Sequence, residues 1–181
     1  MKTEKLGPAF NRLFSASAIS NLADGLLAVA APLLAISLTK NPVLISMLSS
    51  LVMLPWLLFA IPIGLIVDRV DKRLLITFTN SLRFVIAGLL ALAISTDFVT
   101  IYWLFVAAFL IGISEVASDT ASQSLIPVIL EKKHFERANS RLNIAQTVIQ
   151  NFIGGPLSGF LYATAVVLPF VLNSAGFLIA A

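Results

Sequence analysis

The sequence has no cysteine and only one histidine, and only 12% of its residues are charged. The lack of cysteine excludes disulfides, thiolate metal sites and cysteine nucleophiles. The single His134 excludes a cluster of histidine metal ligands, so no metal or other cofactor is expected. Instead, 59% of the residues are hydrophobic, and the mean hydropathy is +0.98. These values exclude an ordinary soluble domain and indicate an integral membrane protein.

Six apolar runs account for most of the chain. At about 1.5 Å rise per residue, roughly twenty residues cross the hydrocarbon core of a bilayer. We therefore predict an all-α, polytopic membrane protein, a six-helix bundle whose sixth helix is incomplete because its run is short and still apolar at Ala181. The predicted helices cover residues 13–38, 43–67, 74–95, 99–123, 141–163 and 167–181. The polar stretch 126–140 is expected to lie along the membrane surface.

The basic residues are distributed unequally between the two sides of this predicted bundle. Of the twelve Lys and Arg residues, only Lys40 falls in an outer turn and Arg83 falls within a helix. The others gather at the amino terminus, in the turn 68–73 and in 132–141. Because cytoplasmic loops carry an excess of Lys and Arg, we expect a plasma-membrane protein with a cytoplasmic amino terminus. Nucleic-acid binding is not indicated, since these residues lie beside apolar runs.

Four charged residues lie inside predicted spans, where each costs at least ~2.5 kcal/mol unless it has a partner or faces a cavity. Asp24 lies near mid-depth on the face of the first helix that also carries Asn21. It is a candidate for proton exchange, and structural hydrogen bonding to Asn21 or a neighbouring helix is the alternative. Glu115 and Arg83 both lie roughly 12 to 14 Å from the cytoplasmic side, which predicts an ion pair. Asp119 is nearer the interface on the same polar face as Glu115.

The fifth predicted helix combines amides with small residues. Gln146 and Gln150 lie on its polar face, which leads into a run that contains Gly155, Pro156 and Gly159. Glycines at this density allow helix backbones to approach closely, and the proline removes one helical hydrogen bond. Polar faces on three helices predict a shared watery path for a solute or a proton. Packing contacts within a bundle without a cavity are the alternative.

The turn between the second and third helices carries the most specific motif of the chain. The residues that carry this motif are Gly64, Asp68, Arg69, Asp71, Lys72 and Arg73. The motif resembles the signature loop of the major facilitator superfamily, and its form is similar to that of macrolide efflux proteins and the enterobactin exporter. Asp71 stands where that family usually has its second glycine. The run 155–159 resembles the family's antiporter motif, with Phe160 where a further glycine is common.

The resemblance implies an amino-terminal half of a carrier built from two six-helix bundles that works by alternating access. It implies that Asp68, Arg69 and Arg73 act in a conformational latch, whereas a plain determinant of topology is the alternative. The expected partners are the lipid bilayer, a small-molecule substrate, and a carboxy-terminal half in cis or a second copy in trans. No nucleic-acid partner is expected.

The expected function is proton-coupled efflux of drugs or other amphipathic small molecules, driven by the proton gradient and without a cofactor. A siderophore exporter is the alternative within the same class. The alternative from a different functional class is an inactive truncated fragment or a non-transporting membrane scaffold. An intramembrane enzyme is not expected, because the sequence offers no Ser/His, Cys/His or metal-binding set.

Overall fold

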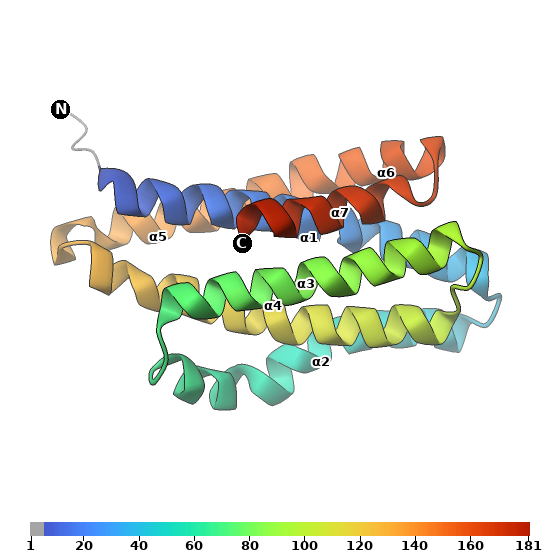
Figure 1. The fold of residues 1–181 in the computed structure, drawn as a ribbon, viewed down its shortest axis with the longest axis horizontal. Helices are drawn as coiled ribbons and strands as arrows, with labels where there is room; N and C mark the ends of the chain where they lie inside the picture. Colours follow the sequence, from blue (N-terminus) through green and yellow to red (C-terminus); the bar gives the residue numbers. More distant parts are fainter. Residues whose placement is uncertain (1–5) are drawn as a thin grey trace.

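Helices account for nearly all of residues 6–181, which are the residues that the computed structural model describes. Their axes run roughly along the long axis of the molecule (Figure 1). No strand occurs among these residues, so the predicted all-α class is confirmed. The elements are α1 Gly7–Leu38, α2 Pro42–Val67, α3 Lys72–Ser95, α4 Ile101–Ile129, η1 Lys132–His134, α5 Phe135–Ile144, η2 Ala145–Gly154, α6 Gly155–Thr164 and α7 Leu168–Ala180.

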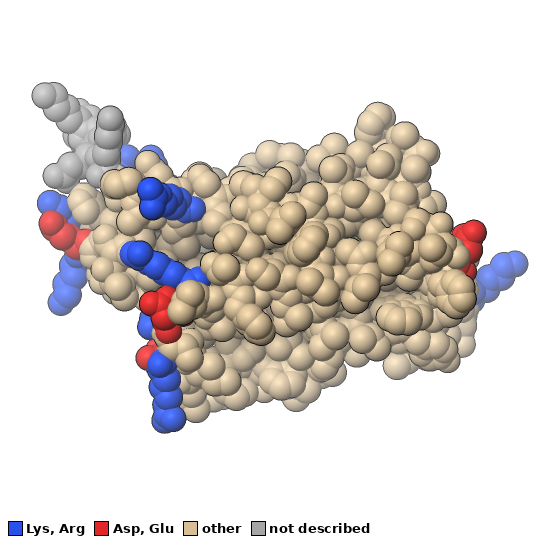
Figure 2. Space-filling model, in the orientation of Figure 1, with Lys and Arg blue, Asp and Glu red and all other residues tan. Residues whose placement is uncertain are grey.

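Four of these helices, α1 to α4, are long and apolar enough to cross a membrane. The ten-residue segments α5, η2 and α6 follow one another without a break, and α7 is a shorter apolar helix. On the face seen in Figure 2, charged side chains gather at the two ends of the molecule and leave an uncharged band between them. Leu57 and Ile61 on α2 are each 81% exposed. In a bilayer this exposed apolar surface faces lipid instead of water, so it carries no hydrophobic penalty.

Three predicted helix boundaries need correction. The fourth helix continues to Ile129, beyond the predicted end at 123, and the following helix begins at Phe135 instead of 141. The reason is burial, since Ile126, Ala138 and Leu142 pack in one apolar cluster. The other side chains of the stretch 126–140 are exposed or half-buried. That this stretch lies along the membrane surface stays a prediction. α1 likewise begins at Gly7, before the predicted start at 13, because Phe10 is fully buried in the same cluster.

Two larger apolar cores lie at the ends of the bundle, and a polar layer and a smaller apolar cluster around Phe177 lie between them. One core contains Leu34 and Leu104, close to the turns that follow α1 and α3, and the other contains Phe10 and Ile126, at the opposite end. α4 packs against α2 and α3, whereas α1 packs against α7, η2 and α6, and α3 contacts α7. Several buried polar residues, among them Asn21, Asp24 and Arg83, lie at the level between the two cores. The packing therefore places polar chemistry in the middle of the bundle.

The backbones of α1 and η2 approach each other closely where two glycines meet. A Cβ at Gly154 would lie 2.8 Å from the Cα of Gly25, and a Cβ at Gly25 would overlap the backbone oxygen of Gln150. Helices in membranes use glycine in this way because close backbone contact strengthens dispersion attraction between them. Gly154 lies just before the run 155–159 that the sequence motif singled out.

We expect Gly25→Ala to destabilise the protein, because α1 and η2 must separate to admit the new methyl group. Forced overpacking of this kind costs about 1–3 kcal/mol. Gly159→Ala is the matched control, since a Cβ there meets nothing within 4 Å. Thermal unfolding of the purified protein in detergent checks both variants, and equal melting temperatures for the two would contradict the close crossing.

Candidate functional site

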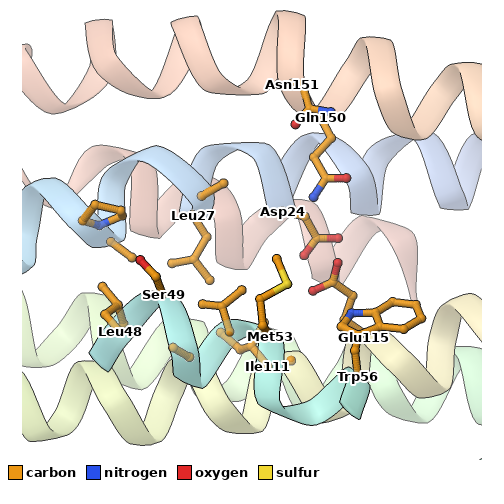
Figure 3. Close-up of a pocket in the computed structure, with 16 residues that line it drawn as sticks. Asp24, Leu27, Leu48, Ser49, Met53, Trp56, Ile111, Glu115, Gln150 and Asn151 are labelled. Carbon is orange, nitrogen blue, oxygen red and sulfur yellow. The ribbon is translucent and has the colours of Figure 1, made fainter. Parts of the chain in front are cut away.

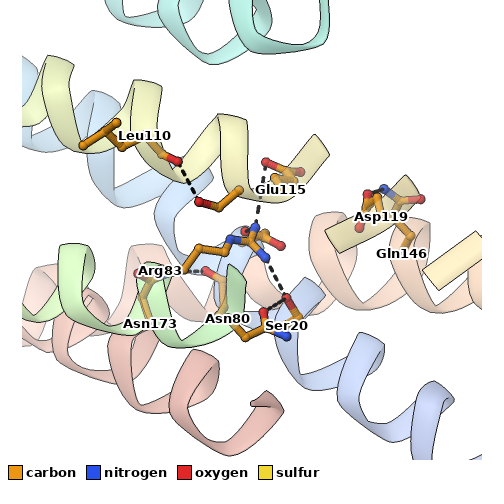
Figure 4. A network of polar contacts seen from close by, with 11 residues as sticks. Ser20, Asn80, Arg83, Leu110, Glu115, Asp119, Gln146 and Asn173 are labelled. Carbon is orange, nitrogen blue, oxygen red and sulfur yellow. Dashed lines mark hydrogen bonds and ion pairs between the residues drawn. The ribbon is translucent and has the colours of Figure 1, made fainter. Parts of the chain in front are cut away.

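An ion pair between helices α1 and α3 occupies the centre of the polar layer. Arg83 is completely buried, and its Nη2 pairs with Oδ1 of Asp24. Its Nη1 donates a hydrogen bond of 2.9 Å to the hydroxyl of Ser20 (Figure 4). The guanidinium carbon lies 4.2 Å from the ring centroid of Phe177, which comes from α7. Residues from α1 and α7 therefore surround one buried guanidinium, which comes from α3.

Asp24 is a nearer partner of Arg83 than the predicted one. The predicted pair with Glu115 is present, with 4.0 Å between Arg83 Nη2 and Glu115 Oε2, which is the outer limit of an ion pair. The depths estimated from the sequence placed Arg83 on α3 and Glu115 on α4 at one level in the membrane. Such estimates do not show which helices are neighbours, and so they did not reveal that α1 approaches α3. Asp24 therefore takes the short contact, and Glu115 is only weakly compensated.

Several polar side chains around the pair were not singled out from the sequence. Ser20 donates a hydrogen bond of 3.3 Å to Asn80, which lies one helical turn before Arg83 on α3. On α7, Asn173 donates through Nδ2 to the backbone oxygen of Ala23 at 2.6 Å. The three-residue spacing of Asn80 and Arg83 was a readable signal for one polar face. Asn173 gave no such signal, because its own helix is otherwise apolar apart from the neighbouring Ser174.

A third, partly buried carboxylate interacts with an amide. Asp119 Oδ2 accepts a hydrogen bond of 3.2 Å from Gln146 Nε2, which joins α4 to η2. Glu115 accepts no hydrogen bond from the side chains of residues 6–181. The polar layer thus holds three carboxylates, from Asp24, Glu115 and Asp119, and one guanidinium. It carries more potential negative charge than positive charge.

Two cavities lie on either side of this charge network. The larger, about 380 Å³, extends toward the turn after α1 and is lined by Asp24, Glu115 and Gln150 together with many apolar side chains. The smaller, about 30 Å³, is lined by Asn21, Asp119 and Gln146 among other polar residues. Its volume suffices for a water molecule. The network therefore separates an amphipathic cavity from a polar one.

Gln146 and Gln150 of η2 reach different cavities because they lie at different depths along the helix. This segment is a π-helix, in which hydrogen bonds join residues five apart instead of four. Two residues four apart complete nearly one full turn in either kind of helix, so the two amides share a face and lie one turn apart. Gln146 bonds to Asp119 beside the smaller cavity, and Gln150 lines the larger one. The single polar face predicted for this helix is divided between two sites.

The run 155–159 forms the beginning of α6 and packs on α1. Ser158 is buried and donates a hydrogen bond of 2.6 Å to the backbone oxygen of Leu26. A Cβ at Gly155 would lie 3.5 Å from Val29. Pro156 lies in the first turn of α6, where a missing N–H is tolerated. Gly155, Pro156 and Gly159 thus follow the close crossing at Gly154 directly.

The charged turn lies far from this network, at the end of the bundle. Asp71 caps α3, because its Oδ1 accepts hydrogen bonds from the backbone N–H groups of Leu74 and Arg73 at 3.1 and 2.8 Å. These bonds, with that to Leu74 the larger cause, hold the pKa of Asp71 below its usual value. Lys72 Nζ donates to the carbonyl of Val67 at 3.3 Å. Asp68 and Arg69 follow α2 directly and are exposed.

Asp71 therefore has a local structural role at the position where the family usually has glycine. A carboxylate that accepts two backbone hydrogen bonds fixes the start of α3, and this needs no partner from another part of the protein. Gly64 lies in the last turn of α2, where a Cβ would meet nothing within 4 Å. Neither residue forms a contact with the buried charge network in the described chain.

We expect single replacements in the central ion pair to be more harmful than the double replacement. Asp24→Asn leaves Arg83 without its nearest anion, and Arg83→Gln leaves Asp24 buried without a cation, each at a cost of about 3–5 kcal/mol. Asp24→Asn combined with Arg83→Gln removes both charges, so its cost should be well below the sum. Melting temperatures of the purified variants measure this coupling. Strictly additive losses would show that the two residues do not interact.

Comparison with known proteins gives one match. A family model described as Major Facilitator Superfamily matches residues 13–181, which is most of the chain. The comparisons with curated proteins and with solved structures returned no match.

Proposed function

Because this chain belongs to the Major Facilitator Superfamily, a family of transporters and not of enzymes, we propose that it exports drugs or other amphipathic small molecules in exchange for protons. The observation that carries this proposal is the position of the Asp24–Arg83 network between an amphipathic cavity and a polar one. A carrier that alternates its access needs such a central point, where substrate and coupling ion act on one set of side chains.

The excess of carboxylates supports proton coupling. One guanidinium cannot compensate Asp24, Glu115 and Asp119 together, so a proton has a chemically suitable acceptor in this layer. Protonation of Asp24 would release Arg83 to Glu115, which is already within 4.0 Å. We therefore assign proton coupling to Asp24 and Glu115, and the hydrated side of the path to Asn21, Asp119 and Gln146.

A partner bundle is part of the proposal. The outer face of α5 and η2 carries a shallow polar groove lined by Asn139, Asn143 and Thr147. Lipid cannot satisfy these amides and hydroxyls, so protein or water must cover them. We propose that a carboxy-terminal half in cis, or a second copy in trans, packs against this face and completes the path.

The orientation proposed is a plasma-membrane protein with a cytoplasmic amino terminus. Arg12, Arg69 and Arg73 lie at the end of the bundle that also holds η1, and Lys40 lies at the opposite end. The positive-inside rule places the first group in the cytoplasm. On this side Asp68, Arg69 and Arg73 are exposed and suitably placed to pair with the partner bundle as a latch. The likeness of this turn to that of macrolide efflux proteins supports export.

We expect cells that express the protein to accumulate less of the fluorescent amphiphile ethidium than empty-vector cells, and a proton uncoupler should remove the difference. Asp24→Asn should lose the uncoupler-sensitive part, because the amide cannot exchange a proton. Asp97→Asn is the control, since Asp97 lies in the distant turn after α3. Equal accumulation with and without uncoupler and in empty-vector cells would overturn the proposal. Unchanged transport by Asp24→Asn would exclude that residue from coupling.

The latch assignment predicts different effects for replacing Asp68 and Asp71, two carboxylates of the same turn. Asp68→Asn should abolish transport while membrane insertion stays normal, because its charge is needed for pairing with the partner bundle. Asp71→Asn should retain transport, because asparagine still caps the helix. Transport and the amount of protein in isolated membranes are measured together. Loss of insertion in Asp68→Asn would favour a topology role, and loss of transport in Asp71→Asn would place Asp71 in the latch.

A further inference from the structure

The larger cavity has its charged groups at one end. Its α1 wall runs from Asp24 to Pro32, and its α4 wall runs from Glu115 back to Ala108. Both walls therefore begin with a carboxylate in the polar layer and become apolar toward the turns after α1 and α3. Figure 3 shows the side chains of Asp24 and Glu115 directed into the same space. The volume of about 380 Å³ lies within the range of small-molecule sites.

The charge at this end is not balanced by the protein. Arg83 is committed to Asp24 and Ser20, and its remaining contact with Glu115 is 4.0 Å long. Glu115 accepts no hydrogen bond from the side chains of residues 6–181, and its side chain is 19% exposed. A carboxylate in such a place is stabilised by any positive group that enters the cavity, since the low dielectric strengthens their attraction.

The rest of the lining suits the apolar body of such a group. Trp56 and Met53 from α2 and Ile111 from α4 line the cavity together with the carboxylates, and Trp56 is drawn near Glu115 in Figure 3. An indole face attracts organic cations through its π electrons. Methionine adapts its shape to different ligands. The lining thus combines an anion, an aromatic ring and a flexible apolar wall.

We infer that this cavity selects organic cations that carry an apolar body, with Glu115 as the residue that recognises the positive charge. This inference rests on the proposed function and gives the substrate its chemical class. Binding of an anion of the same shape is disfavoured, because the anion would face two carboxylates. The single positive charge of Arg83 compensates only one of their two negative charges. Asp24 is held by its ion pair, so Glu115 supplies the selectivity.

Two ions of nearly the same shape and opposite charge test the inference. Binding of tetraphenylphosphonium and tetraphenylborate is measured on the purified protein in lipid nanodiscs, with empty nanodiscs to subtract partition into lipid. We expect the cation to bind at least tenfold more tightly than the anion. Glu115→Gln should lose at least tenfold in affinity for the cation, and should bind the anion as well as before or better.

Asp97→Asn is the matched control, because it removes one carboxylate outside the cavity and asparagine tolerates the positive φ of 56° at that position. It should keep the affinity of the unmodified protein. Equal or tighter binding of the anion to the unmodified protein would overturn the inference even if Glu115→Gln does not fold. Unchanged cation binding by a folded Glu115→Gln would overturn the role of that residue.

The two proposals fail separately. Uncoupler-sensitive ethidium export with no preference for the cation in nanodiscs would overturn the charge selectivity and leave proton-coupled export standing. Selective binding of the cation with no uncoupler-sensitive export would leave the binding site standing and overturn the transport proposal.

Discussion

The ion pair of Asp24 and Arg83 is the constraint on which the rest of the bundle depends. A guanidinium in the middle of a membrane protein is tolerated only with an anion and further donors or acceptors around it. Asp24 and Ser20 supply these from α1, and the ring of Phe177 covers the guanidinium from α7. The side chain of Arg83 therefore fixes the rotation and depth of α1, α3 and α7 relative to one another. An apolar contact would not fix them as specifically.

The two apolar cores have a different role. They hold the ends of the bundle, through groups such as Leu34 with Leu104 and Phe10 with Ile126. Lipid is as apolar as these side chains, so their packing depends on close fit more than on exclusion of water. Gly25 and Gly154 contribute such a fit between α1 and η2. The side chains of the polar layer can therefore rearrange while the two ends of the bundle remain packed.

Run length and charge predicted most of the fold, because a membrane span is defined by properties of consecutive residues. The start at Gly7 and the end at Ile129 were missed, since they depend on the burial of Phe10 and Ile126 in a shared core. Contacts between helices that are distant in the sequence also could not be predicted. Depth counting paired Arg83 with Glu115, and only the packing of α1 on the bundle reveals Asp24 as the nearer anion.

The site residues could be identified from the sequence as a group, because a charged residue inside a membrane span is costly without a partner. The separate role of each residue could not be predicted. Gln146 and Gln150 lie one turn apart on η2 and line different cavities, and the sequence does not show where one cavity ends and the other begins. A fully compensated ion pair would hold the polar layer in one arrangement. With Glu115 left over beside Asp24, a proton or an organic cation can each supply the missing positive charge. Since one carboxylate cannot be fully satisfied by both, the same imbalance would give the proposed exchange of the two a physical basis.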